Sequence, residues 1–252
     1  MKLLESFRIR ARSALRARLP SLAGIVPRPP RVDLRLDDFD GPGEVPTAKL
    51  DIDGWQEQVV AFVQWAGPMP ARIVARADHR DLADLVRFCH RLEMATTVRT
   101  GPAGLSQARA EELLDRGMAT CELVVEALDA EAEEAARALV HARHSRAGQL
   151  SVHLHVRGHA APGDDLRARA RSLGIDRVVA SAPWVGPDGL PGERRTGGHC
   201  PVASRRVLLL PDGSVVACSF KGGGASSFPP DLADHRAAIH NCDRACTHPE
   251  TA

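Results

Sequence analysis

The stretch "ARIVARADHRDLADLVRFCHRLEMATTVR", residues 71–99, predicts one complete β–α–β unit. Residues 71–76 and residues 94–99 are expected to be short strands. Between them, residues 80–92 place apolar side chains at helical spacing, at Leu82, Leu85, Val86, Cys89 and Leu92. Strands that alternate with helices of this length indicate a parallel sheet.

The same alternation continues on both sides of this stretch. Further strands are expected at 32–36, 120–127, 150–157 and 176–180, and further helices at 54–66, 106–116, 129–144 and 164–173. Asp53 is expected to be the N-cap of the helix at 54–66. Five or six such units suit a partial or complete β/α barrel, or else a doubly wound sheet. We predict a partial (β/α)6-type barrel in a domain spanning residues 31–182.

Residues 1–30 are expected to form a basic amphipathic helix and a linker. Residues 1–19 carry one lysine and five arginines against one glutamate, and Leu4, Phe7, Ala11 and Leu15 share one helical face. The basic face is either simply solvated or a contact for a membrane surface or a partner. The sequence "PRPP" at 27–30 ends this segment.

The bulk composition excludes some classes of function. The chain has 252 residues, is 44% hydrophobic and carries a net charge of +1, so no basic field argues for nucleic acid. Tyr is absent and aromatic residues make up only 4%, which disfavours a stacking platform for bases. No apolar run reaches the roughly 18–20 residues that cross a bilayer. No secretory signal is apparent, so we expect a cytoplasmic protein whose cysteines are not paired in structural disulfides.

Residues 183–252 are expected to form a small cysteine-rich module of a β-hairpin and a helix. Strands at 206–210 and 214–218 flank a Pro-Asp-Gly turn, and a helix is expected at about 229–240. Four of the six cysteines lie in this segment: Cys200, Cys218, Cys242 and Cys246. Four thiolates suit one 4Fe-4S cluster or one zinc ion, and the wide spacing favours iron–sulfur over zinc or no metal. Cys89 and Cys121 are expected to be buried small hydrophobes.

Cys200, Gly213 and Cys218 carry a resemblance to a known module. The pattern Cys-x12-Gly-x4-Cys resembles the opening of a SPASM or twitch module, the auxiliary-cluster extension of radical SAM enzymes. The resemblance implies that Cys242 and Cys246 complete one auxiliary 4Fe-4S site. Residues 50–180 are similar to a radical SAM core in their general β/α sequence pattern. Residues 99–101 and 127–129 stand where the family has its motifs after the third and fourth strands.

The chain departs from that family where SAM is cleaved. The family carries Cys-x3-Cys-x2-Cys after its first strand, whereas this sequence has no cysteine before Cys89. Residues 31–50, "RVDLRLDDFDGPGEVPTAKL", offer only carboxylates, and "ARADHRD" at 75–81 stands where the family has Gly-Gly-Glu. The resemblance therefore implies a degenerate pseudoenzyme or accessory subunit. We expect it to lack SAM as a cofactor and to serve an active radical SAM partner or a peptide substrate.

Alternation along the strands places polar side chains on one face of the sheet. Arg76, Arg99, Glu126 and His155 are expected in the barrel lumen near the carboxyl ends of the strands, where β/α barrels hold their sites. They form either a polar pocket for a peptide, a nucleotide or a remnant SAM, or salt bridges that fill the lumen. Two other functions stay open: an enzyme of another class that uses this lumen, and a binding module stapled by zinc.

Overall fold

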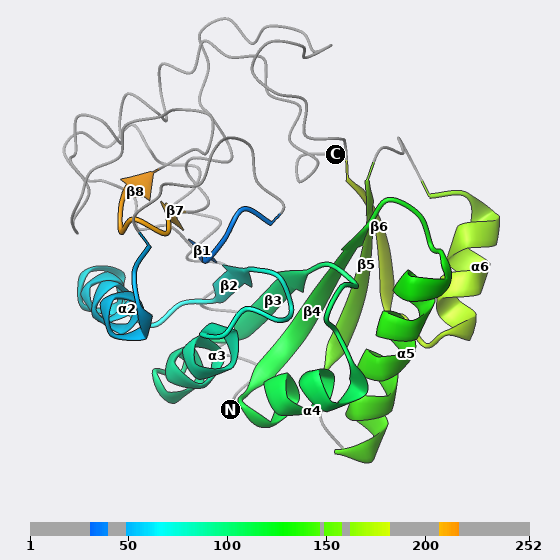
Figure 1. Ribbon diagram of the computed structural model, residues 1–252, viewed down its shortest axis with the longest axis horizontal. Coiled ribbons are helices and arrows are strands. Elements are labelled where there is room, and N and C mark those ends of the chain that lie inside the picture. The colour runs from blue at the N-terminus through cyan, green and yellow to red at the C-terminus, as the bar shows by residue number, and fades with distance from the viewer. Residues whose placement is uncertain (1–30, 40–48, 147–148, 158–161, 182–206, 217–252) are drawn as a thin grey trace, which may run out of the picture.

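Figure 1 shows one open sheet in which six strands lie side by side in the order of the chain. In this computed structural model the described residues are 31–39, 49–146, 149–157, 162–181 and 207–216. The strand order is β6-β5-β4-β3-β2-β1-β7-β8, and every pair from β6 to β7 is parallel.

The elements follow the alternation that the sequence predicts. The strands are β1 (Val32–Arg35), β2 (Ala71–Val74), β3 (Thr96–Thr100), β4 (Met118–Val125), β5 (Ser151–Arg157), β6 (Arg177–Ser181), β7 (Val207–Leu209) and β8 (Val215–Val216). The helices are α2 (Ile52–Ala66), α3 (Leu82–Arg91), α4 (Gln107–Asp115), α5 (Ala130–Ser145) and α6 (Asp164–Ser172).

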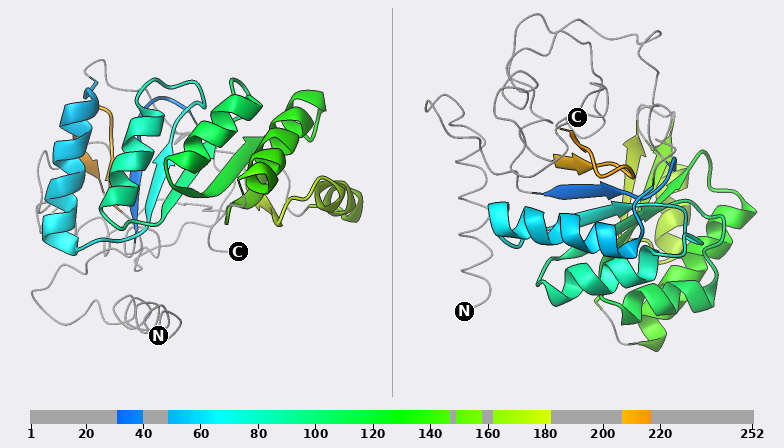
Figure 2. Two further views of the ribbon diagram at one scale, coloured as in Figure 1. Left: turned by 90° about the horizontal axis from the view of Figure 1, so that it is seen from below. Right: turned by 60° about the vertical axis from the view of Figure 1, so that its left-hand side comes forward.

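The five helices of the described residues lie on the same side of the sheet (Figures 1 and 2). A doubly wound sheet reverses its strand order and carries helices on both faces. Here the strands from β1 to β6 run in sequence without a reversal, as they do in a β/α barrel. The arrangement confirms an α/β fold with a parallel sheet and is consistent with a partial barrel.

The N-cap of α2 differs from the expected residue. Asp51, not Asp53, caps this helix, and its Oδ1 accepts a hydrogen bond from the Gly54 amide at 2.9 Å. Asp53 lies instead in the first turn, where its negative charge interacts favourably with the helix dipole. The helix begins at Ile52, two residues before the start that the apolar periodicity predicts. A polar capping residue is not part of an apolar pattern, so the periodicity does not locate it.

The β7–β8 hairpin joins the main sheet. Its strands are antiparallel, as expected, and Gly213 has the positive φ of 81° that the Pro-Asp-Gly turn requires. The sequence did not indicate that β7 would pair in parallel with β1, with Val32 opposite Val207. Residues 1–30, the expected helix at 229–240 and all four cysteines of the tail lie outside the described residues.

The apolar core fills the layer between the sheet and the helices. Trp55 and Phe62 of α2 are its largest members, and both are almost fully buried. Cys89 and Cys121 are free and buried in this layer, and burial raises the pKa of the Cys89 thiol to about 12. Burial raises the pKa of Cys121 as well. Both thiols therefore stay protonated and behave as small hydrophobes, as predicted. No helix in the described ranges is long and apolar enough to cross a membrane.

Gly117, between α4 and β4, offers a test of local backbone strain. Its φ is 106°, and a Cβ built on it lies 2.7 Å from the Cβ of His90. We expect Gly117→Ala to lower the free energy of unfolding by about 1–3 kcal/mol, measured by urea denaturation. Gly67→Ala is the control for strain alone, because Gly67 has a φ of 85° and open space around it within the described structure. Equal losses in both variants would contradict a clash with His90.

Candidate functional site

Charged side chains line the face of the sheet opposite the described helices α2–α6. In register, Asp33 of β1 pairs with Arg72 of β2, and Arg99 of β3 pairs with Glu122 of β4. His155 of β5 points to the same face, because side chains alternate along a strand and its neighbours Leu154 and Val156 belong to the helix-side core. This polar face confirms the alternation argument.

These side chains form a buried ion network. Arg72 donates to Asp33 at 2.5 Å, Arg99 donates to Glu122 at 2.9 Å, and Arg72 also lies 3.6 Å from Glu122. The Asp33 carboxylate is 1% exposed and Glu122 is 14% exposed. Burial alone would raise the pKa of Glu122, but the charges of Arg72 and Arg99 outweigh it and lower that pKa. Glu122 is therefore an anion shared by two guanidinium groups.

His155 completes this network as a neutral ring. Its Nδ1 lies 3.0 Å from Nη1 of Arg99, and its Nε2 lies 4.0 Å from Glu122. Since an arginine can only donate, Nδ1 accepts the hydrogen bond and the ring proton belongs on Nε2. Burial, and next the charge of Arg99, lower the pKa of His155 to about 4. The ring therefore orients Arg99 and carries no charge at neutral pH.

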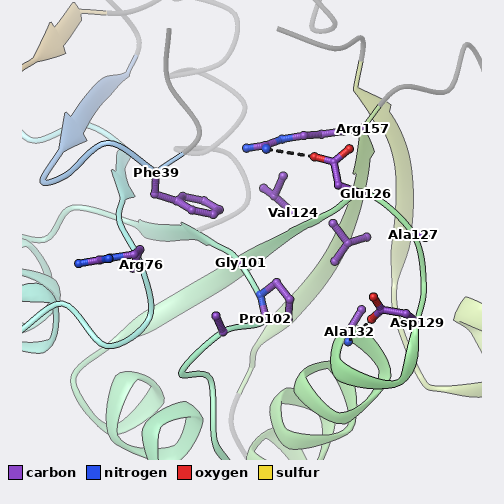
Figure 3. A pocket seen from close by; sticks show the side chains of 12 residues that line it. Phe39, Arg76, Gly101, Pro102, Val124, Glu126, Ala127, Asp129, Ala132 and Arg157 are labelled. Carbon is purple, nitrogen blue, oxygen red and sulfur yellow. Dashed lines mark hydrogen bonds and ion pairs between the residues drawn. The ribbon is translucent and has the colours of Figure 1, made fainter. Parts of the chain in front are cut away.

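A pocket of about 300 Å³ opens at the carboxyl ends of the strands (Figure 3). Residues that follow β1, β2, β3 and β4 meet there with the end of β5 and the first turn of α5. The lining residues are Phe39, Arg76, Gly101, Pro102, Ala103, Val124, Val125, Glu126, Ala127, Asp129, Ala132 and Arg157. This is the edge at which β/α barrels place their ligand sites.

The charged residues of the pocket lie around a mainly apolar wall. Nη1 of Arg157 lies 3.2 Å from Glu126, and its guanidinium lies over the Phe39 ring, 5.8 Å from the centroid. Arg76 stands on the opposite side in the view of Figure 3, and its side chain is 62% exposed. Asp129 accepts from the Ala132 amide as the N-cap of α5.

Asp37 fixes the loop after β1 against the segment after β2. Its side chain is 2% exposed; Oδ1 accepts from the Phe39 amide and Oδ2 from the Arg76 amide, each at 2.9 Å. This carboxylate therefore holds in place two residues that line the pocket. Both of its oxygens are occupied by backbone donors.

The four lumen residues predicted from sequence occupy two settings. Arg99 and His155 contact one another within the buried network, whereas Arg76 and Glu126 line the pocket. The strand alternation explains this division, because the network lies within the strands and the pocket lies beyond their ends. The structure thus has salt bridges within the sheet and a pocket at its edge, and the ligand that the sequence analysis considers for this pocket stays a prediction.

Several residues of the site were missed among the sequence candidates. Asp33 and Glu122 supply the carboxylates of the network, and Phe39 and Arg157 line the pocket. Alternation does predict that Glu122 and Arg157 lie on the polar faces of their strands, but neither is among the four residues expected near the strand ends. Asp33 and Phe39 had no such signal in a short strand and a loop. Within the described ranges, no cluster of three or more His, Cys, Asp or Glu could hold a metal ion.

Comparison with known proteins adds information on the fold alone. No protein-family model and no curated protein matches the chain. The crystal structure of Streptococcus suis SuiB bound to precursor peptide SuiA is similar, with a TM-score of 0.62 and 10% identity over 95% of this chain and 70% of that chain. SuiB bound to S-adenosylmethionine gives 0.61, with 12% identity over 96% of this chain and 69% of that chain. A third SuiB crystal structure gives a TM-score of 0.61, with 10% identity over 85% of this chain and 66% of that chain.

The chain thus spans about two thirds of the length of SuiB. The likeness agrees with the strand order and with the helices on one face of the sheet. At this identity it extends to the fold and not to the activity. The chain has an α/β fold similar to that of SuiB.

Proposed function

We propose that this chain is a radical SAM-like accessory protein that does not cleave SAM by itself. It binds one auxiliary 4Fe-4S cluster and serves an active radical SAM partner or a peptide-modifying pathway. The observation that carries the proposal is the loop after β1. Where the family places three thiolates, this chain has no cysteine, and Asp37 uses both of its oxygens on backbone amides.

The residues at this edge do not fit a cluster that binds SAM. Iron–sulfur clusters are held by soft thiolates, whereas carboxylates are hard donors that suit other metals. The positions that correspond to the family's motifs after the third and fourth strands still line the pocket, at Gly101, Ala127 and Asp129. The pocket therefore has the position and shape of a ligand site, but this edge of the sheet lacks the thiolates that hold a cluster for the reductive cleavage of SAM.

The donor set in the tail supports the auxiliary cluster. Cys200, Cys218, Cys242 and Cys246 are four thiolate sources, and Gly213 between the first two has the positive φ that a tight return of the chain needs. When bound, such a cluster supplies one-electron transfer or folds the tail around itself. SuiB has been solved with a precursor peptide, and this favours a peptide-modifying pathway for the present chain.

Iron analysis tests the auxiliary cluster. The full chain, purified without oxygen, is expected to contain about four iron and four sulfide ions per molecule. Cys218→Ser should remove most of the iron, because each thiolate is one of four ligands. The matched control is Cys89→Ala, which should keep the iron since the Cys89 thiol is buried and protonated. A colourless protein with one zinc ion would contradict the iron–sulfur assignment and favour the zinc-stapled binding module.

An assay of SAM consumption, with dithionite as the reductant, tests the accessory role. The chain alone, with its iron present, is expected to consume no SAM above a sample without protein. SAM consumption at several turnovers per chain would show an active enzyme and would refute the proposal.

The open pocket also favours a second candidate, an enzyme of another class. Its polar groups meet over an apolar wall at the edge where barrel enzymes hold substrates. Under this candidate, Glu126→Gln would abolish an activity or phenotype that Cys218→Ser leaves intact. The opposite pattern supports the cluster-based function.

A further inference from the structure

The pocket at the carboxyl edge of the sheet has an apolar floor. Val124, Val125 and Ala132 form this floor, and each of them is at most 5% exposed. Val124 lies between Glu122 and Glu126 in the alternation along the polar face of β4. The floor therefore separates the pocket from the buried ion network and offers a ligand apolar contacts only.

The ring of Phe39 forms one wall of the pocket. In Figure 3 it points towards Val124 from the loop after β1. The Phe39 amide donates to Oδ1 of Asp37 at 2.9 Å, which fixes the backbone of this residue. A Cβ built on Gly101 lies 2.9 Å from Cε2 of Phe39, so a larger residue at position 101 would displace the ring. The pocket volume of about 300 Å³ therefore depends on the position of this ring.

The charged residues of the lining already contact other groups of the protein. Nη1 of Arg157 lies 3.2 Å from Glu126, and Asp129 accepts from the Ala132 amide. Nε of Arg76 lies within 3.8 Å of two carboxylates. A charged ligand group would have to displace one of these contacts, because a buried charge needs a partner. An uncharged apolar group leaves all of them in place.

The entrance of the pocket stays in water. The side chains of Glu126 and Arg76 are mostly exposed and form a charged rim around the apolar floor. A volume of about 300 Å³ is at the small end of the range for ligand pockets. A small apolar pocket inside a polar rim suits a single apolar side chain whose backbone remains at the surface.

We propose that this pocket binds one uncharged aliphatic side chain of a peptide, of about the size of leucine. The binding leaves the Arg157–Glu126 pair intact and buries apolar surface of the ligand against the floor and the Phe39 ring. The inference rests on the proposed function and names the kind of peptide residue that the protein would receive.

Titration of the full isotope-labelled chain with N-acetyl-leucinamide and N-acetyl-asparaginamide tests the proposal by NMR. The two probes have side chains of nearly the same shape, but only the first is apolar. N-acetyl-leucinamide is expected to shift the amide signals of Gly101 and Ala103 and to bind at least about tenfold more tightly. Equal affinities, or no shift at the pocket with either probe, would overturn the proposal.

Free leucine separates a peptide residue from a free amino acid. Its ammonium and carboxylate groups would have to lie at the pocket, where the charged side chains already have partners. We expect free leucine to bind about tenfold more weakly than N-acetyl-leucinamide. Tighter binding of free leucine would overturn the assignment to a peptide.

Phe39→Ala is expected to change the size preference of the pocket. Removal of the ring widens the pocket, so the affinity for N-acetyl-phenylalaninamide should rise about tenfold relative to that for N-acetyl-leucinamide. Partial unfolding would weaken both probes and would not change their ratio. An unchanged ratio in a folded variant would contradict a wall formed by Phe39.

Val124→Thr tests the floor, because it adds a hydroxyl group at nearly constant volume. It is expected to weaken N-acetyl-leucinamide about three- to tenfold. The matched control is Val152→Thr, the same change at a buried valine of β5 outside the pocket lining, which should alter the affinity by less than about twofold. Equal affinities in the two variants would overturn the role of the floor.

Iron content and SAM consumption are measured separately on the same preparations. Failure of N-acetyl-leucinamide to bind a chain that holds its full cluster refutes this inference and leaves the accessory role standing. SAM turnover by a chain that binds N-acetyl-leucinamide refutes the accessory role and leaves the side-chain pocket standing.

Discussion

Glu122→Ala is expected to lower the free energy of unfolding by about 3 kcal/mol, because it leaves two buried guanidinium groups without their shared carboxylate. Arg72 and Arg99 are 7% and 9% exposed, and Glu122 lies 3.6 Å from the first and 2.9 Å from the second. Water cannot replace the lost charge fully at this depth. Urea denaturation of the purified chain measures the loss.

Glu126→Ala is the matched control for that substitution. Glu126 follows the same strand, shares its polar face with Glu122 and also pairs with an arginine, but it is 76% exposed. We expect a change within about 0.5 kcal/mol. Equal losses at both positions would show that the buried network contributes no more than a surface ion pair.

Acid is expected to destabilise the protein through His155. The folded pKa of about 4 lies below the ordinary value of 6.5 because burial and Arg99 oppose the charged ring. Between these values the unfolded chain binds a proton that the folded chain does not, so stability falls as the pH falls from 6.5 towards 4. The difference corresponds to about 3 kcal/mol when the window is complete.

Urea denaturation at pH 6.5 and pH 5.0 measures this effect. We expect the native chain to lose about 1.5 kcal/mol more than His155→Gln over this interval. The pKa values of His79 and His153 are also lowered, chiefly by burial, but both residues are present in both proteins and cancel in the comparison. Glu122 titrates below this interval, since its pKa is lowered from 4.5. The same pH dependence in both proteins would contradict a neutral, buried His155.

The periodic pattern of apolar and polar residues in the sequence was sufficient to predict the fold class. It also predicted which strand residues form the charged face of the sheet. Val152, Leu154 and Val156 alternate with His153, His155 and Arg157, and this period of two defines a strand with one polar face. The buried Cys89 and Cys121 could also be assigned, because each lies within a local apolar pattern. Such features depend on neighbours within a few residues.

Partners across the sheet could not be assigned in the same way. The pairing of Arg99 with Glu122 depends on the register of β3 against β4, and a shift of one residue would turn Glu122 to the other face. Phe39 lies in a loop, and its position over Gly101 and beneath Arg157 joins three segments that are distant in sequence. The placement of β7 beside β1 joins residues 32 and 207.

The sequence by itself determined the β/α alternation, the polar face of the sheet, the absence of a cysteine before Cys89 and the four cysteines of the tail. Only the tertiary structure decided which charges neutralise one another and which face a pocket. The reason is physical: secondary structure follows short-range periodicity, whereas the energy of a charge depends on its burial and on neighbours that long-range strand pairing brings together.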